Sequence, residues 1–129
     1  MHYPLDVNEY ELENLIGEGA TAKVYVALCK KNHSRVAIKI IDLEHCPVSI
    51  ETLRQEVAFW SSCESSNVVE YYGSFIAGHN IYLLMEYMSG GSLYEIMRFS
   101  YPNGFQNESY IATNVLQILQ ALKYLGIFY

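Results

Sequence analysis

A lysine interrupts an apolar stretch of the sequence, VAIKIIDL at residues 36–43, in which four of the eight residues are β-branched. Burying the ammonium group of Lys39 in such a strand costs several kcal/mol unless an anion meets it. Two interpretations are open. Either the head group of Lys39 reaches solvent at the edge of a sheet, or it has an anionic partner.

A glutamate on a predicted helix is one candidate partner for Lys39. Ser49 is a favourable N-cap for a helix that extends to about residue 62. The apolar residues of this helix recur at helical spacing: Ile50, Leu53, Val57 and Trp60. Glu56 lies beside this stripe, so we expect it to face the sheet and to pair with Lys39. A solvated position on the flank of the helix is the alternative for Glu56.

A glycine-containing loop, IGEGATAKV at residues 16–24, offers a second kind of partner for Lys39. Gly17 and Gly19 allow the backbone to turn tightly and to bring N–H groups close to phosphate oxygens. On its own this loop is also compatible with an ordinary hairpin turn. Phosphate binding is therefore one of two interpretations of the loop.

Two other phosphate-binding loops fit the sequence poorly. A dinucleotide-binding loop would use Asp42, which lies about 20 residues after the glycines, but it needs a helix directly after the loop. The alternation of Val24, Val26 and Leu28 predicts a strand there. The pattern G-x-x-x-x-G-K-[ST] of the Walker loop is absent from the sequence.

The elements that must position these residues are five strands and one helix. The alternation of apolar and polar residues and the turn signals predict strands at residues 10–17, 23–31, 36–43, 68–75 and 81–88. The helix from Ser49 falls between the third and fourth strands. Ser89-Gly90-Gly91 ends this part of the chain.

The remaining residues have a helical pattern. A short helix is predicted at about 92–98, a loop at 101–109, and a long helix at about 109–125. The long helix has one apolar stripe of Ile111, Val115, Ile118, Leu122 and Leu125, and a second of Leu116 and Leu119. Such a helix requires cover on most sides, so we expect the chain to self-associate through residues 109–125 or to recruit a chaperone.

The composition of the chain argues against several classes of protein. A chain of 129 residues is long enough for one domain, and its net charge of −6 with no long basic run argues against a nucleic-acid partner. Three cysteines without C-x-x-C spacing indicate a reducing compartment. No apolar stretch approaches the roughly 20 residues of a membrane span, and no signal peptide is recognisable. We therefore expect a cytoplasmic protein.

In this order, the glycine loop, the lysine strand and the helix glutamate resemble the small lobe of a eukaryotic protein kinase. The stretches IGEGATAKVYVALC, VAIKIIDLEHC, SFIAGHN and MEYMSGGSLYEIMRFSYPNGF resemble Sterile-20-group Ser/Thr kinases of the Fray or oxidative-stress-responsive type. The last stretch is closest to their plant members. The resemblance covers residues 8–125.

The resemblance implies an α+β fold: a protein-kinase-like small lobe, with a five-stranded antiparallel sheet and one main helix, followed by the first helices of an incomplete large lobe. Residues 1–129 would form a partial kinase domain. Within it, the small lobe would span about 8–88, and the truncated start of the helical large lobe about 89–129.

The resemblance also implies ATP as the cofactor. Ala22 stands where most kinases have the third glycine of the loop, which would stiffen the loop without removing its backbone contacts. Val24 and Ala37 would lie above adenine, and Lys39, held by Glu56, would reach the α- and β-phosphates. The implied ATP-binding residues are Ile16, Gly17, Glu18, Gly19, Ala20, Thr21, Ala22, Lys23, Val24, Ala37, Lys39, Met85, Glu86, Met88 and Ser92.

Within that set, four residues follow the lysine strand. The resemblance makes Met85 the gatekeeper, Glu86 to Met88 the hinge whose backbone binds the adenine edge, and Ser92 a contact to ribose. Protein substrates and an upstream kinase are the implied partners.

The motifs that would complete catalysis do not occur in residues 1–129. H-R-D-x-x-x-x-N and D-F-G supply the base and the Mg²⁺ ligands of the family, and the chain's two aspartates, Asp6 and Asp42, both precede the helix of Glu56. We therefore expect no catalytic residue and no Mg²⁺ ligand in this chain. Three interpretations stay open: part of a Ser/Thr kinase, a non-catalytic nucleotide- or partner-binding module, or an unstable fragment from a gene prediction.

Overall fold

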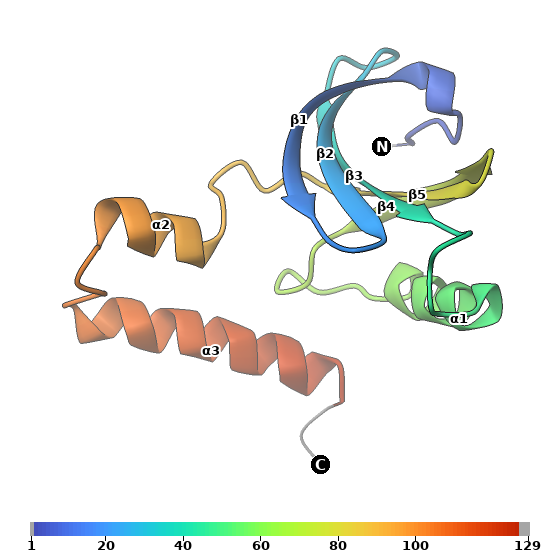
Figure 1. Ribbon diagram of the computed structural model, residues 1–129. Coiled ribbons are helices and arrows are strands. Elements are labelled where there is room, and N and C mark those ends of the chain that lie inside the picture. Colours follow the sequence, from blue (N-terminus) through green and yellow to red (C-terminus); the bar gives the residue numbers. More distant parts are fainter. Residues whose placement is uncertain (1, 127–129) are drawn as a thin grey trace. The chain divides into compact units, whose positions relative to one another are not determined.

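A five-stranded antiparallel sheet dominates the computed structural model, which describes residues 2–126 (Figure 1). The strands follow the order β1-β2-β3-β5-β4 across the sheet. Their bounds are β1 Tyr10–Glu18, β2 Ala22–Cys29, β3 Arg35–Asp42, β4 Tyr71–Ala77 and β5 Asn80–Glu86. The helices are η1 Val7–Glu9, α1 Ile50–Ser61, α2 Leu93–Ser100 and α3 Glu108–Tyr124. The predicted fold class, a five-stranded antiparallel sheet with one main helix, is confirmed.

The chain divides into two compact units. We call residues 2–64 and 69–87 the sheet unit, and residues 65–68 and 88–126 the helical unit. The sheet unit contains all five strands together with η1 and α1, and the helical unit contains α2 and α3. None of the described helices is long and apolar enough to cross a membrane.

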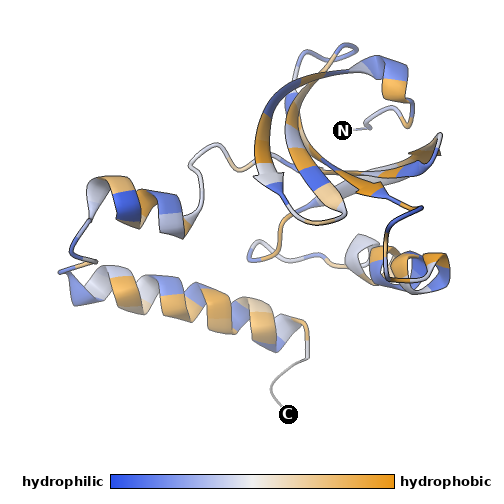
Figure 2. Ribbon diagram, viewed as in Figure 1, coloured by the Kyte–Doolittle hydropathy of each residue, from blue (hydrophilic) through white to orange (hydrophobic). Residues whose placement is uncertain are grey.

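Short turns join the neighbouring strands of the sheet unit. Between β2 and β3, the side-chain oxygen of Asn32 accepts a hydrogen bond from the backbone N–H of Ser34 at 3.0 Å, and His33 adopts a positive φ of 58°. Gly78, with φ of 61°, occupies the turn between β4 and β5. Hydrophobic and hydrophilic residues both occur along the strands, as Figure 2 shows, and successive side chains of a strand point to opposite faces of the sheet.

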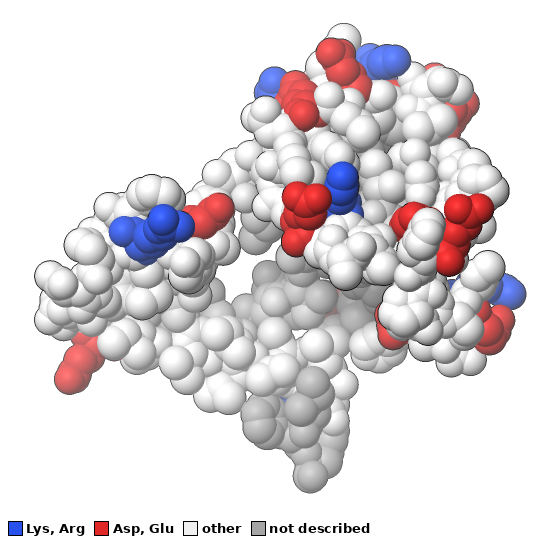
Figure 3. All heavy atoms as spheres, in the orientation of Figure 1, with Lys and Arg blue, Asp and Glu red and all other residues white. Residues whose placement is uncertain are grey.

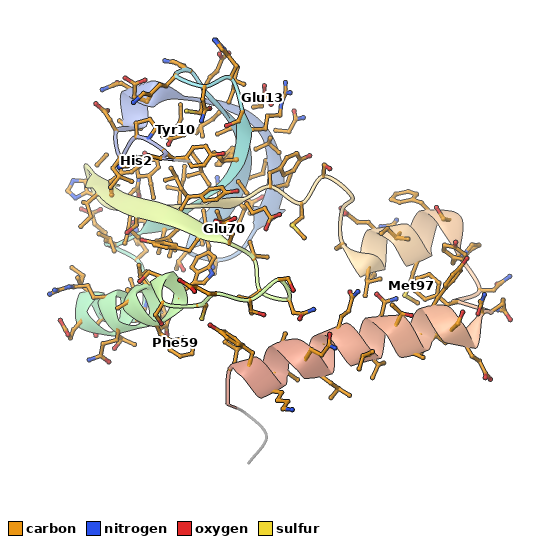
Figure 4. All side chains as sticks on the ribbon, turned by 180° about the vertical axis from the view of Figure 1, so that it is seen from behind. His2, Tyr10, Glu13, Phe59, Glu70 and Met97 are labelled. Carbon is orange, nitrogen blue, oxygen red and sulfur yellow. The ribbon has the colours of Figure 1, made fainter. Side chains whose placement is uncertain are left out.

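One face of the sheet is covered by the N-terminal segment. The ring of Tyr3 stacks on Tyr72 with centroids 4.4 Å apart, and the hydroxyl of Tyr10 donates a hydrogen bond to the carbonyl of Pro4 at 2.7 Å. Figure 4 shows Tyr10 within the curve of the sheet. The buried residues on this face are Tyr3, Tyr10, Ala27, Cys29, Val36, Ile38 and Leu84. This N-terminal cover, with η1, was not predicted from the sequence.

The helix α1 packs on the other face. Leu53 is buried with Ile41 and Leu83, and Val57 and Trp60 are packed against this cluster. Ser49 caps α1 as predicted, with its side chain accepting a hydrogen bond from the N–H of Thr52 at 3.2 Å. Ile50 departs from the predicted stripe because it stands in the first turn and stays 56% exposed.

The strand β4 begins three residues later than predicted. Residues 65–68 form a turn, closed by a hydrogen bond from Val68 N–H to the carbonyl of Ser65 at 3.2 Å. The indole N–H of Trp60 donates to the carbonyl of Val69 at 2.9 Å, so this carbonyl bonds to α1. The ladder with β5 therefore starts only at Tyr71.

The helical unit has strong caps and little burial. Ser92 and Glu95 form a reciprocal capping box at the start of α2, and Asn107 caps α3 by accepting a hydrogen bond from Ser109 N–H at 2.9 Å. Neither α2 nor α3 contains a buried residue. Charged residues are sparse over these helices in the view of Figure 3, which leaves the visible surface there mostly white.

Candidate functional site

The glycine loop connects β1 to β2 through a tight turn. Gly19 N–H donates a hydrogen bond to the carbonyl of Ala22 at 2.8 Å, which closes the turn around Ala20 and Thr21. Glu18 and Lys23 face each other across it, with an N–O distance of 3.7 Å, and both side chains are more than half exposed. Of the predicted loop residues, Ile16, Gly17 and Glu18 lie on β1, and Ala22, Lys23 and Val24 on β2.

Strand register places five of the predicted residues on one face of the sheet. Gly17 is opposite Val24, and Val24 is opposite Lys39. Residues opposite each other in an antiparallel pair project to the same face. A Cβ atom at Gly17 would lie 3.4 Å from the Cβ of Val24, in van der Waals contact with it.

A second row of the same face lies two residues earlier in β3. Ala37 is opposite Val26 on β2 and opposite Met85 on β5. Ala37 is buried, and Met85 is half-buried. We call this surface, made of Gly17, Val24, Ala37, Lys39 and Met85, the lysine face. The structure therefore brings together five of the predicted site residues from four strands.

Glu56 does not reach Lys39 in the structure. None of the ion pairs among residues 2–126 joins the two side chains, and Glu56 is exposed on α1. The reason is the direction in which α1 packs. Leu53, Val57 and Trp60 point at the sheet, and Glu56 is on their flank, away from the centre of the packed stripe. In this position of α1, Glu56 is exposed on the flank of the helix, which was the alternative interpretation. The pairing of Glu56 with Lys39 stays a prediction for a different position of α1.

The predicted hinge follows the end of β5. Glu86 N–H donates to the carbonyl of Glu70 at 2.9 Å, which holds the last residue of β5 against the chain before β4. Met88 and Ser92 belong to the helical unit. There Met88 is 57% exposed, and the Ser92 hydroxyl accepts a hydrogen bond from Glu95 N–H at 3.1 Å.

Neither aspartate of the chain lies on the lysine face. Asp6 caps η1 by accepting a hydrogen bond from Asn8 N–H at 2.9 Å. Asp42 is at the end of β3, one residue past Ile41, so its side chain projects to the opposite face. The described residues of the lysine face thus include no aspartate that could hold a Mg²⁺ ion there.

A cavity of about 510 Å³ lies on the face opposite Lys39, next to the glycine loop. Its floor consists of Tyr25, Ile40 and Tyr82, which the register places on one face. Asp42 and His45 stand at its rim, with His45 Nδ1 2.6 Å from Asp42 Oδ2. This hydrogen bond lowers the pKa of Asp42 and raises that of His45.

Sequence reasoning missed this cavity. The available signal was the alternation of β2 and β3: residues that alternate with Val24 and Lys39 must form a second surface behind the loop. The sequence does not show whether side chains fill that surface.

Comparison with known proteins gives a consistent result. The protein kinase domain family matches residues 10–126. The chain is 44% identical over 124 residues to the Serine/threonine-protein kinase fray2 of Dictyostelium discoideum. It is 35% identical over 130 residues to Germinal center kinase 3 of Caenorhabditis elegans, and 34% identical over 116 residues to the Serine/threonine-protein kinase hippo of Drosophila melanogaster.

These alignments cover most of this chain and little of the relatives. They include 95%, 95% and 90% of the chain, but 12%, 22% and 17% of the respective relatives. The chain therefore corresponds to a fraction of each relative's length.

Proposed function

Because this chain belongs to the protein kinase domain family, we propose that its sheet unit is the ATP-binding part of a Ser/Thr protein kinase. The observation that carries this proposal is the register that places Gly17, Val24, Ala37, Lys39 and Met85 on the lysine face. A glycine turn, small apolar side chains and one cation on a single surface suit the phosphates and the base of a nucleotide.

Each of these groups has a proposed task. The backbone N–H groups of the loop from Gly17 to Ala22 approach phosphate oxygens, and the ammonium of Lys39 offsets the phosphate charge. Val24 and Ala37 leave room for the flat adenine ring on the lysine face. The backbone of Glu86 to Met88 binds the edge of the ring, and Ser92 contacts ribose.

The pairing of Lys39 with Glu56 requires a different position of α1. Rotation of α1 about its axis toward β3 would bring the flank residue Glu56 to the lysine face. The hydrogen bond from Trp60 to Val69, 2.9 Å long, opposes that rotation. We propose that nucleotide binding to Lys39 favours the rotated position, because the phosphates then hold the lysine in reach of the carboxylate.

A Fray-type subgroup is the finer assignment we propose. It is supported by the identity of 44% to fray2 and by the Ala-Thr-Ala sequence after Gly19. The closer likeness to plant members stays a prediction. We further propose that residues 8–88 form the small lobe and 89–129 the start of the large lobe, which the division of the chain after Tyr87 supports.

Phosphoryl transfer is proposed for the kinase domain of which these residues are a part. The family uses ATP and Mg²⁺ and acts on proteins, and residues 1–129 contain neither H-R-D nor D-F-G. The chain by itself is expected to position nucleotide without transferring phosphate. The chemistry that we propose for the lysine face is thus nucleotide binding and charge compensation.

A binding titration tests the proposal. We would measure the affinity of the 129-residue chain for ATP without metal by calorimetry, and compare Lys39→Met with Lys31→Met as the matched control. Loss of the charged contact at Lys39 is expected to weaken binding by about tenfold or more, whereas Lys31 is exposed and lies in the turn before β3. Equal affinities of the two variants, or no binding by the unmodified chain, would contradict the proposal.

A further inference from the structure

Two turns of the sheet unit meet beside the end of β3. The first follows Asp42 and contains Glu44 and His45, and the second joins β4 to β5 at His79. Leu43 N–H donates a hydrogen bond to the carbonyl of His79 at 2.9 Å, and Asp42 is opposite Asn80 in the ladder. The backbone therefore fixes the two turns against each other.

Four side chains of types that can ligate metals gather at these turns. His45 Nδ1 is 2.6 Å from Asp42 Oδ2, and His79 Nδ1 is 3.1 Å from Glu44 Oε1. One ligand atom each from Asp42, Glu44 and His45 lie within 4.8 Å of one another. The arrangement joins two imidazoles and two carboxylates from separate parts of the sequence.

We propose that Asp42, Glu44, His45 and His79 form a binding site for a divalent transition metal, with Zn²⁺ as the reference ion. Two nitrogen and two oxygen ligands suit zinc, whereas Mg²⁺ and Ca²⁺ take oxygen ligands. The site is separate from the lysine face, because Asp42 projects to the opposite side of the sheet from Lys39. It does not depend on the nucleotide-binding proposal.

Three of the four ligand atoms are already grouped, and His79, which contacts only Glu44 among them, must move to join the other two. A tetrahedral zinc ion with bonds of about 2.0–2.1 Å needs ligand atoms roughly 3.4 Å apart. The separations in the structure, 2.6 and 3.1 Å for the two pairs and up to 4.8 Å within the group of three, lie on both sides of that value. Between 41% and 77% of each of the four side chains is exposed, so small rotamer changes can adjust their positions.

The local charge also favours a cation. Among the ion pairs of residues 2–126, neither Asp42 nor Glu44 pairs with a lysine or arginine; their partners are His45 and His79. A divalent ion would neutralise both carboxylates at once. It would also tie the two turns to the glycine loop, since Asp42 N–H donates to the carbonyl of Thr21 at 3.0 Å.

A zinc titration of the 129-residue chain tests the site. We would titrate Zn²⁺ by calorimetry in a buffer that does not chelate metal, and expect binding at one site per chain. His45→Ala and His79→Ala are each expected to weaken binding by about tenfold or more. His33→Asn is the matched control: His33 lies in a different turn, and its positive φ of 58° suits asparagine.

Cobalt absorption separates this site from a thiolate site. Cys46 follows His45 directly, and thiolates bind zinc well. The Co²⁺ complex should show no thiolate charge-transfer band, and Cys46→Ser should bind as the unmodified chain does. Unaltered circular dichroism of the histidine variants would show that they are folded.

Three results would overturn the proposal. They are the absence of saturable Zn²⁺ binding, equal binding by the His45→Ala, His79→Ala and His33→Asn variants, and a thiolate band that disappears in Cys46→Ser. Each is measured without nucleotide, so failure of the metal site leaves the nucleotide proposal standing.

Discussion

The sheet unit and the helical unit differ in where their apolar side chains lie. All twelve buried hydrophobic residues of the described chain belong to the sheet unit, on the two faces of its sheet. In the helical unit, large apolar side chains are instead exposed, among them Leu116 at 55% and Leu119 at 45%. Figure 4 shows the side chains crowded about the strands, and standing along the outside of α3.

This difference indicates that the two units are stabilised by different interactions. The sheet unit gains its free energy from burying apolar area on both faces of one sheet. The helices α2 and α3 rely on capping and on backbone hydrogen bonds within each helix. Isolated helices of such length are marginal in water, so the helical unit needs an apolar partner surface more than the sheet unit does.

The largest expected effect is a difference in the free energy of unfolding between two variants, each with one leucine shortened, one in each unit. Leu84 is fully buried, so Leu84→Ala should lower the free energy of unfolding by about 2–5 kcal/mol. Leu119→Ala, at an exposed position, should change it by less than about 0.5 kcal/mol. Urea unfolding followed by the fluorescence of Trp60 measures both. Equal losses would show that the helical unit has a core of its own.

The next effect concerns the exposed faces of α3. The unmodified chain should self-associate, and Leu116→Lys with Leu119→Lys should shift it toward monomer, because two charges then interrupt the apolar surface. Sedimentation velocity over a range of concentrations measures the shift. Gln117→Lys adds a charge on the same helix and serves as the control. A chain that is already monomeric would refute this expectation.

Removing a helix cap should destabilise the helical unit more than the sheet unit. Asn107→Ala removes the side-chain acceptor at the start of α3 and should cost about 1 kcal/mol of local helix stability, visible as lost helical circular dichroism. Ser49→Ala removes the corresponding acceptor from α1, which Leu53 and Trp60 also hold against the sheet. The loss of helical signal should be smaller for Ser49→Ala. The reverse order would contradict the contrast between the two units.

The smallest effect is a pH dependence confined to the sheet unit. The hydrogen bond from Arg35, 2.8 Å long, lowers the pKa of Glu13 below its usual value of 4.5. The stabilisation is therefore present above about pH 4.5 and is lost as the pH falls through the lower, folded-state pKa. Thermal unfolding of the unmodified chain and of Glu13→Gln should differ slightly near neutral pH and converge in acid. A difference that grows in acid would have the wrong sign.

Much of the fold follows from local sequence patterns. The apolar, β-branched run VAIKIIDL predicts β3, and the serine before α1 predicts its cap, since both depend on residues that are neighbours in the chain. The burial of Ile50 was predicted wrongly, because helical periodicity gives the direction of a side chain and not whether the sheet extends far enough to cover it.

The candidate site, like the fold, was predicted from the sequence only in part. The sequence places Gly17, Lys39 and Glu56 on a loop, a strand and a helix, and thereby predicts which chemistry each can offer. It does not fix the rotation of α1. In the structure, the indole N–H of Trp60 donates a hydrogen bond to the carbonyl of Val69, and Leu53 and Val57 pack against the sheet.

By itself, the sequence determined the order of the elements, the residues of the glycine loop and the presence of a cation in an apolar strand. Only the tertiary structure decided which of these residues share a face, because that depends on the pairing of strands distant in the sequence. Strand pairing places Lys39 beside Val24 and Leu83. It also brings His79, from the turn between β4 and β5, beside Asp42 and Glu44 at the end of β3. Lys39 therefore has its neighbours from register, and an anionic partner for its ammonium group stays a prediction.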